Sequence, residues 1–245
     1  MKELENLSIV FAVFCFVILF GGESARAVPL PFDPLTVGLN PGDQFRLAFV
    51  TNGTHDALSS DITVYNDFVT AQAEQAGALT AGLGLRWKAI ASTESADARV
   101  NTDTIPDTSP DAPIFLVDGT EVADSNTDLW DGTIDNALRV DQFGLITPEF
   151  AFTGTTSLGF ADVSTDSTLG SAAPREGAES LTTANWIQGP KGVIHPDAPA
   201  PFYAVSSLMM VPHSTNAVPE PDTLVLFGVG MVGLGCWRRR KRNKV

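Results

Sequence analysis

The chain has 245 residues, with 29 acidic and 15 basic side chains and a formal net charge of −14 at neutral pH. Both cysteines, Cys15 and Cys236, lie in apolar segments near the two ends, so the central part has no thiol for a disulfide or a zinc site. An acidic surface repels nucleic acid and anionic lipid, which argues against both as partners. About 190 central residues remain, enough for one domain with a substantial core.

The first apolar segment is typical of a secretion signal. Residues 7–20 are almost wholly apolar, and Ala25 and Ala27 place small side chains at the two positions that a signal peptidase reads. We therefore expect signal peptidase to remove residues 1–27 by cleavage after Ala27. Acidic residues leave the n-region without its usual positive charge, so an uncleaved anchor is the alternative.

Residues 28–212 are predicted to form a single exported α+β domain. Large apolar residues alternate with smaller or polar ones over residues 45–51, which predicts a half-buried strand. Apolar residues recur every three or four positions from Ser60 to Ala76, which predicts the one clear helix, with Ser60 as its cap and Gly77 as its end. Gly, Pro and Asp then separate short apolar runs that predict short strands between long loops: 86–91, 114–117, 150–152, 185–188 and 203–211.

The charge of the exported part is more one-sided than that of the whole chain. From residue 28 to residue 222, seven cations face 26 carboxylates, a net charge of −19. Cations and neutral glycans remain candidate ligands, and solubility outside the cell is the alternative reason for such a surface.

Oxygen-bearing side chains alternate at Asp124, Asn126 and Asp128, which resembles the opening of a calcium loop. The EF-hand pattern then fails, because Leu129 takes the place of the required glycine and Asp135 that of the bidentate glutamate. An irregular calcium site is one interpretation, with calcium as the candidate cofactor. The other is ordinary turn chemistry, in which Asp and Asn side chains bond to their own backbone.

Catalytic motifs are absent from the sequence. Its three histidines, His55, His195 and His213, are accompanied by neither a Gly-x-Ser-x-Gly elbow nor a His-Glu-x-x-His helix. We therefore expect no enzymatic activity, with a secreted hydrolase as the alternative. Four aromatic residues are candidates for a sugar-stacking platform, with burial in the core as the alternative: Trp87, Trp130, Trp186 and Phe202.

Short aromatic and Asp-Gly landmarks follow one another in a definite order between residues 44 and 212: 45–49, the helix, 87–89, 114–119, 129–132, 169–171 and a final apolar strand. This order resembles the endostatin-type branch of the C-type-lectin-like fold. The resemblance implies long loops around a small core and paired first and last strands; it carries over a shape and not a ligand. An extracellular polysaccharide or a surface protein is the candidate partner of the exported domain. That family's cysteines, arginine-rich heparin face and zinc-binding histidines have no counterparts here, so neither heparin nor zinc binding is carried over.

The C-terminal end combines three elements after a polar linker at residues 213–217. An extended Pro-Glu-Pro element comes first, an uncharged apolar run follows over residues 223–237, and a basic cluster comes last. The 15 apolar residues span about 22 Å of helix against a hydrocarbon core of roughly 30 Å, which is marginal for a permanent anchor. The elements are Val218, Pro219, Glu220 and Pro221, and then Arg238, Arg239, Arg240, Lys241 and Arg242.

These three elements, residues 218–245, resemble the PEP-CTERM sorting signal of exported bacterial proteins. The resemblance implies that an exosortase-type transpeptidase in the inner membrane recognises residues 218–221 and releases or re-attaches the exported domain. We expect the protein to cross the inner membrane, to be held there at least transiently by its C-terminal transmembrane helix, and to reach the cell surface or extracellular matrix. An ordinary anchor with stop-transfer charges is the alternative.

Overall fold

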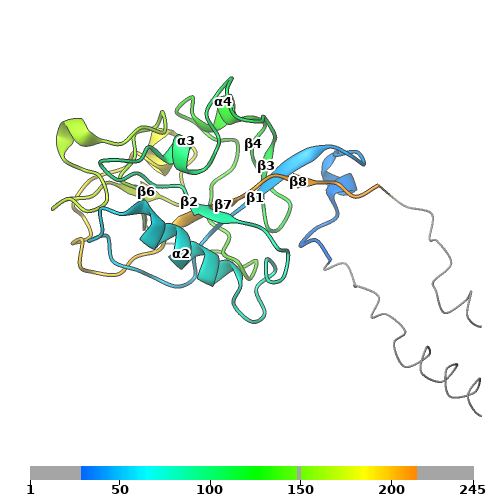
Figure 1. Ribbon diagram of the computed structural model, residues 1–245, viewed down its shortest axis with the longest axis horizontal. Coiled ribbons are helices and arrows are strands. Elements are labelled where there is room, and N and C mark those ends of the chain that lie inside the picture. Colours follow the sequence, from blue (N-terminus) through cyan, green and yellow to red (C-terminus); the bar gives the residue numbers. More distant parts are fainter. Residues whose placement is uncertain (1–28, 148–149, 214–245) are drawn as a thin grey trace, which may run out of the picture.

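A six-stranded mixed sheet forms the centre of the computed structural model, which describes residues 29–147 and 150–213 (Figure 1). The strand order is β2-β7-β1-β3-β4, and β8 pairs with one end of β1. Strand β1 runs parallel to β3 and antiparallel to β7, and β7 is also antiparallel to β2. The bounds are β1 (Gln44–Val50), β2 (Trp87–Ala89), β3 (Ile114–Leu116), β4 (Glu121–Ala123), β7 (Tyr203–Ser206) and β8 (Met209–Met210).

Beside this sheet lie a two-stranded sheet and short helices. The small sheet pairs β5 (Phe150–Phe152) with β6 (Glu176–Ala178). The other elements are α3 (Ala98–Asn101), α4 (Asn126–Leu129) and the 3-10 turns η1 (Pro34–Val37), η2 (Val163–Thr165) and η3 (Ala184–Trp186). The strand predicted at 185–188 is therefore wrong, because η3 occupies its start and buries Trp186.

The strands that come first and last along the chain are neighbours in the sheet. β1 pairs with β7 and β8, and the contact continues outward where the Gly42 N–H donates to the Val211 carbonyl at 2.9 Å. The first and last described residues consequently lie at the same end of the domain, at the right of Figure 1. The mixed α and β architecture with few helices is confirmed. The assignment to a C-type-lectin-like class stays a prediction.

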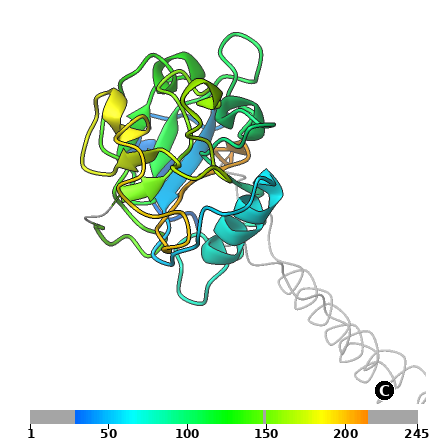
Figure 2. The same cartoon turned by 90° about the vertical axis from the view of Figure 1, so that its left-hand side faces the viewer.

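The longest helix in the described ranges, α2 (Ile62–Ala73), is shorter at both ends than the sequence predicts. Asp61, not Ser60, is its cap, because the Asp61 carboxylate accepts a hydrogen bond from the Thr63 N–H at 2.9 Å. This bond lowers the pKa of Asp61. Figure 2 shows α2 beside the sheet, on the side away from the yellow loops.

The four aromatic residues proposed for sugar stacking lie in the core. Trp87, Trp130, Trp186 and Phe202 are each at most 4% exposed. Trp87 packs edge-on against Phe49 with ring centroids 4.9 Å apart. Since none of the four presents a ring face to solvent, the stacking interpretation is wrong and the alternative, burial, holds.

Two asparagines protect the free edge of β2. The Ala89 N–H donates to Asn66 Oδ1 at 2.9 Å, and Asn101 Nδ2 donates to the Ala89 carbonyl at 2.8 Å. The two amide side chains also bond to each other, from Asn66 Nδ2 to Asn101 Oδ1 at 2.8 Å. An exposed strand edge invites pairing with another chain, and these side chains occupy it instead.

We expect Asn66→Ala to lower the free energy of unfolding by about 1–3 kcal/mol, because it leaves the buried Ala89 N–H without an acceptor. Urea unfolding followed by circular dichroism measures this. Asp67→Ala is the matched control, since Asp67 is an exposed neighbour on the same helix. This variant is expected to change the free energy of unfolding by no more than about 0.5 kcal/mol. Equal losses in both variants would contradict a role for Asn66 at the strand edge.

No helix within the described ranges is long and apolar enough to cross a membrane. The predicted transmembrane segment at 223–237 and the predicted signal peptide at 1–27 lie outside those ranges.

Candidate functional site

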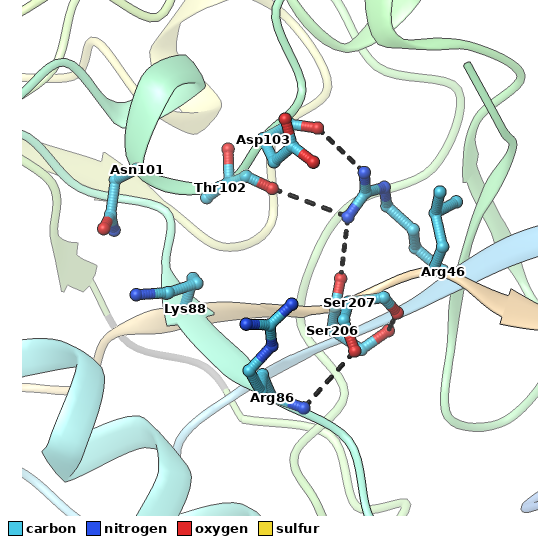
Figure 3. A pocket seen from close by; sticks show the side chains of 9 residues that line it. Arg46, Arg86, Lys88, Asn101, Thr102, Asp103, Ser206 and Ser207 are labelled. Atoms are coloured by element: carbon cyan, nitrogen blue, oxygen red, sulfur yellow. Dashed lines mark hydrogen bonds between the residues drawn. The ribbon is translucent and has the colours of Figure 1, made fainter. Parts of the chain in front are cut away.

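A pocket of about 470 Å³ lies where β1, β2 and β7 meet the loop that follows α3 (Figure 3). Arg46 lies in β1, Lys88 lies in β2, and Arg86 is the residue that precedes β2. Segments 101–103 and 206–208 complete the lining. Its volume falls in the range of about 300–1,000 Å³ that is usual for ligand sites. Three of the seven cations of the exported part therefore line one pocket.

The alternation of β2 explains why two cations reach the pocket together. Successive side chains of a strand point to opposite faces, so Arg86 and Lys88 share the face opposite Trp87. Trp87 is buried against Phe49 and under α2, which fixes the strand's orientation. Burial of the tryptophan thus directs both cations to the pocket side.

The Arg46 side chain is buried, at 1% exposure, and backbone carbonyls of the domain accept its hydrogen bonds. Its Nη1 donates to the Ser206 carbonyl at 3.0 Å and to the Thr102 carbonyl at 3.5 Å, and Nη2 donates to the Asp103 carbonyl at 2.8 Å. Asp103 has a φ of 55°, a left-handed conformation that is uncommon for a residue with a side chain. Among the described residues, Arg46 Nε has no hydrogen-bond partner.

Burial lowers the pKa of Arg46, and the nearby Asp103 carboxylate acts in the opposite direction. An arginine nonetheless stays protonated at physiological pH, because its ordinary pKa lies far above that pH. The buried wall of the pocket therefore carries a permanent positive charge. The Asp103 carboxylate is the one acid in the lining, and its Oδ1 accepts a hydrogen bond from Ser109 Oγ at 3.0 Å.

No side chain of the described residues neutralises Arg86 or Lys88. The ion pairs within the described part of the chain are His55 with Asp56, Arg175 with Asp162, and His195 with Asp197. Arg86 is exposed and Lys88 is half-buried, and neither side chain has a hydrogen-bond partner in residues 29–147 or 150–213. Together with Arg46, they can stabilise an anion.

The residues predicted to bind calcium lie in a tight turn at the start of α4. Asp128 Oδ2 accepts from the Asp124 N–H at 3.1 Å, and Ser125 Oγ accepts from the Asp128 N–H at 3.1 Å. Asn126 is buried, and its Nδ2 donates to the Pro110 carbonyl at 3.2 Å. These bonds are those of the turn alternative. Within the described ranges, no group of three or more His, Cys, Asp or Glu is arranged to hold a metal ion, so calcium binding by Asp124, Asn126 and Asp128 stays a prediction.

Carboxylates nevertheless crowd this region. Burial raises the pKa of Glu121, and the neighbouring charges of Asp135, Asp124 and Asp128 raise it further. Burial is also the main reason that the pKa of Asp128 is raised. The crowding makes the α4 end of the domain acidic, in contrast to the cationic pocket.

The three histidines do not form a site together. His55 packs against Tyr65 and Phe68, while His195 hydrogen-bonds to Asp197 at 2.5 Å on an exposed loop. His213 lines a different pocket, at the end of the domain where the first and last described segments meet. Of the other predicted site residues, Ala27, the sorting element and the basic cluster lie outside the described residues: Val218, Pro219, Glu220, Pro221, Arg238, Arg239, Arg240, Lys241 and Arg242.

Sequence reasoning missed Arg46, Arg86 and Lys88 as site residues. Arg86 and Lys88 flank a tryptophan at strand spacing, and cations are scarce in this acidic domain, so a signal was present for two of the three. Nothing local distinguishes Arg46, which the alternation of its strand would place at an ordinary position.

Comparison with known proteins identifies the tail. Residues 217–241 match the PEP-CTERM protein-sorting motif, which covers the Pro-Glu-Pro element, the apolar run and most of the basic cluster. The motif marks an exported protein that an exosortase processes during membrane-associated sorting. No curated protein matches the chain.

Proposed function

We propose that this protein is a non-catalytic component of the cell surface or extracellular matrix, whose exported domain, residues 28–212, binds a glycan or a surface protein. The sorting motif at residues 217–241 is the observation that carries the proposal. Its order of Pro-Glu-Pro element, apolar run and basic cluster supports an orientation with the preceding domain on the outer side of the inner membrane. The delivered part has no cysteine, so it is stable outside the cell without disulfides.

A C-type-lectin-like class for the domain is part of the proposal. The adjacent first and last strands support it, as do long loops between short strands. In such an arrangement the sheet fixes the two chain ends together and leaves the loops free for recognition.

The arrangement of titratable groups supports a binding role over catalysis. His195 and Asp197 form a hydrogen-bonded pair, but their side chains are 75% and 66% exposed. In the described ranges no serine or threonine hydroxyl bonds to either of them. A water-filled surface position gives little electrostatic stabilisation to a transition state.

We expect the wild-type chain, produced in a bacterium that has an exosortase, to lose both ends. Intact-mass measurement of envelope and medium fractions will then give a protein that begins near residue 28 and ends near residue 218. Replacing Pro219, Glu220 and Pro221 together by alanine is expected to leave the C-terminal segment uncleaved and to retain the protein at the inner membrane.

The matched control replaces Ser214, Thr215 and Asn216 in the adjacent linker by alanine, and it is expected to be processed like the wild type. Full-length protein in the cytosol, or normal processing of the Pro-Glu-Pro variant, would refute the proposal. Turnover of a glycosidic or ester substrate, abolished by replacing one carboxylate or serine, would establish the hydrolase alternative instead.

A further inference from the structure

The cationic pocket is an exception within a strongly acidic domain. Seven cations and 26 carboxylates give the exported part a net charge of −19, yet three cations and one carboxylate line this pocket. Cations of like charge repel one another, and exposed ones gain stability from nearby acids. Within the described part of the chain these cations have no ion-pair partner, so their grouping is unfavourable for the empty domain and favourable for an occupied pocket.

The neutral polar groups around the pocket are already engaged. Asn101 bonds to Ala89 and Asn66, Thr102 Oγ1 donates to the Ala98 carbonyl, and Ser206 Oγ accepts from the Leu47 N–H. Ser207 Oγ accepts from the Arg86 N–H at 3.3 Å. The uncommitted hydrogen-bonding groups are thus mainly cationic donors, which recognise an acceptor-only group better than a neutral hydroxyl.

We propose that the pocket formed by Arg46, Arg86 and Lys88 binds a single oxyanion, a uronate carboxylate or a sulfate ester, carried by a sparsely charged polysaccharide. The inference rests on the proposed function, because it names the chemistry of the glycan that the exported domain would meet. Arg86 and Lys88 contact the oxyanion, and the buried Arg46 supplies a fixed positive charge behind them. Figure 3 shows Arg86 and Lys88 across the pocket from segment 101–103, with Arg46 entering from β1.

The ligand must be sparsely charged because the domain as a whole is strongly acidic. Fields between exposed charges extend over about 8 Å at physiological salt. A densely charged polyanion that covered more than the pocket would meet the surrounding carboxylates and be repelled. A chain with one acidic sugar among neutral ones can place its oxyanion in the pocket without that cost.

The test uses the full chain in detergent solution and a tetrasaccharide of one glucuronic acid and three N-acetylglucosamine residues. Titration calorimetry at low salt is expected to show binding that disappears when the carboxylate is methyl-esterified. Because charge-assisted hydrogen bonds are the strong ones, Arg86→Gln and Lys88→Gln are each expected to weaken binding about tenfold, and the double variant about a hundredfold. An N-acetylglucosamine tetramer with one sulfate ester is the second arm, and it shows which oxyanion is preferred.

Arg139→Gln is the matched control, since Arg139 is an exposed arginine that lines a different pocket. It makes the same change in charge and is expected to leave binding within twofold. Neither Arg86 nor Lys88 has a side-chain partner in the described ranges, and removing either one relieves repulsion between like charges, so the thermal midpoints of the variants are expected not to fall. If a variant is nevertheless less stable, comparing the acid and its ester on the wild type still tests the proposal.

Equal binding of acid and ester, loss of binding in Arg139→Gln, or tighter binding of heparin that is indifferent to Arg86 and Lys88 would overturn the inference. Binding of an acidic peptide but of neither glycan would overturn it as well. Its failure is distinguishable from that of the proposed function. A protein that is sorted and trimmed but binds no acidic glycan refutes only the pocket, whereas an untrimmed cytosolic protein refutes the sorting.

Discussion

Gly177→Ala is expected to lower the free energy of unfolding by about 3 kcal/mol or more, or to prevent folding. A Cβ at this position would lie 2.1 Å from the Trp186 carbonyl oxygen and 3.0 Å from a ring carbon of Tyr203. Neither can move easily, because both residues are buried and Gly177 is paired with Ala151 in the small sheet. Urea unfolding followed by tryptophan fluorescence measures the loss.

A second glycine separates this steric effect from backbone strain. Gly38 has a φ of +89°, and a Cβ there would meet no atom within 4 Å. Gly38→Ala is therefore expected to cost about 1 kcal/mol, from the left-handed backbone alone. Similar losses in the two variants would show that the close approach of η3 to β6 does not hold in solution.

Local periodicity predicts the central elements well and their ends less well. The strand expected at 45–51 is β1 (Gln44–Val50), and the helix expected at 60–76 is α2 (Ile62–Ala73). The half-buried strand expected at 45–51 is nevertheless wrong in one respect, because β1 is buried on both faces from Phe45 to Val50. The strand lies in the middle of the sheet, and its second face is covered as well. The ends depend on single hydrogen bonds, such as the one that makes Asp61 rather than Ser60 the cap.

The cationic pocket depends on contacts that are distant in sequence. The carbonyls that bind the Arg46 guanidinium belong to residues 56, 57 and 160 positions away. An arginine within an alternating strand gives no sign of such partners, so sequence reasoning treats it as an ordinary strand position. The sorting tail is the opposite case, because its three elements are contiguous and can be recognised without a fold.

The second large effect is expected at the buried ion pair between Arg175 and Asp162. Arg175 Nε donates to Asp162 Oδ2 at 2.7 Å, and Nη1 donates to the Gly189 carbonyl at 2.8 Å, while the two side chains are 14% and 4% exposed. Arg175→Met keeps most of the side-chain volume but leaves the Asp162 carboxylate buried without its cation. Removing one partner of a buried pair costs about 3–5 kcal/mol, and we expect a loss of that size at pH 7.

Lys191→Met is the control for this change, because it also removes a cation from this region. Lys191 is exposed, and among the described residues its Nζ bonds only to the Thr165 carbonyl, at 3.0 Å. Its loss is expected to stay below about 1 kcal/mol and to vary little with pH. A comparable loss in the two variants at pH 7 would argue against a special role for the buried pair.

The loss of unfolding free energy in Arg175→Met is expected to depend on pH, and this dependence identifies the Asp162 carboxylate as its cause. Burial alone would raise the pKa of Asp162, but the hydrogen bonds from Arg175, Thr165 and Ser164 and the charge of Arg175 lower it overall. A carboxyl whose pKa is lower in the folded than in the unfolded state stabilises the fold above its ordinary pKa of about 3.9, and this stability is lost as the pH falls through the folded value. In Arg175→Met, Asp162 keeps its burial and its hydrogen bonds from Thr165 and Ser164 but loses the cation. Protonation of Asp162 therefore removes an unpaired buried charge from the variant, whereas in the wild type it breaks a favourable ion pair. The difference in unfolding free energy between the wild type and Arg175→Met is therefore expected to be constant near pH 7 and to narrow below about pH 5, where the carboxyl begins to bind protons. A difference that stays constant down to pH 3 would place the cost in lost packing rather than in the unpaired charge.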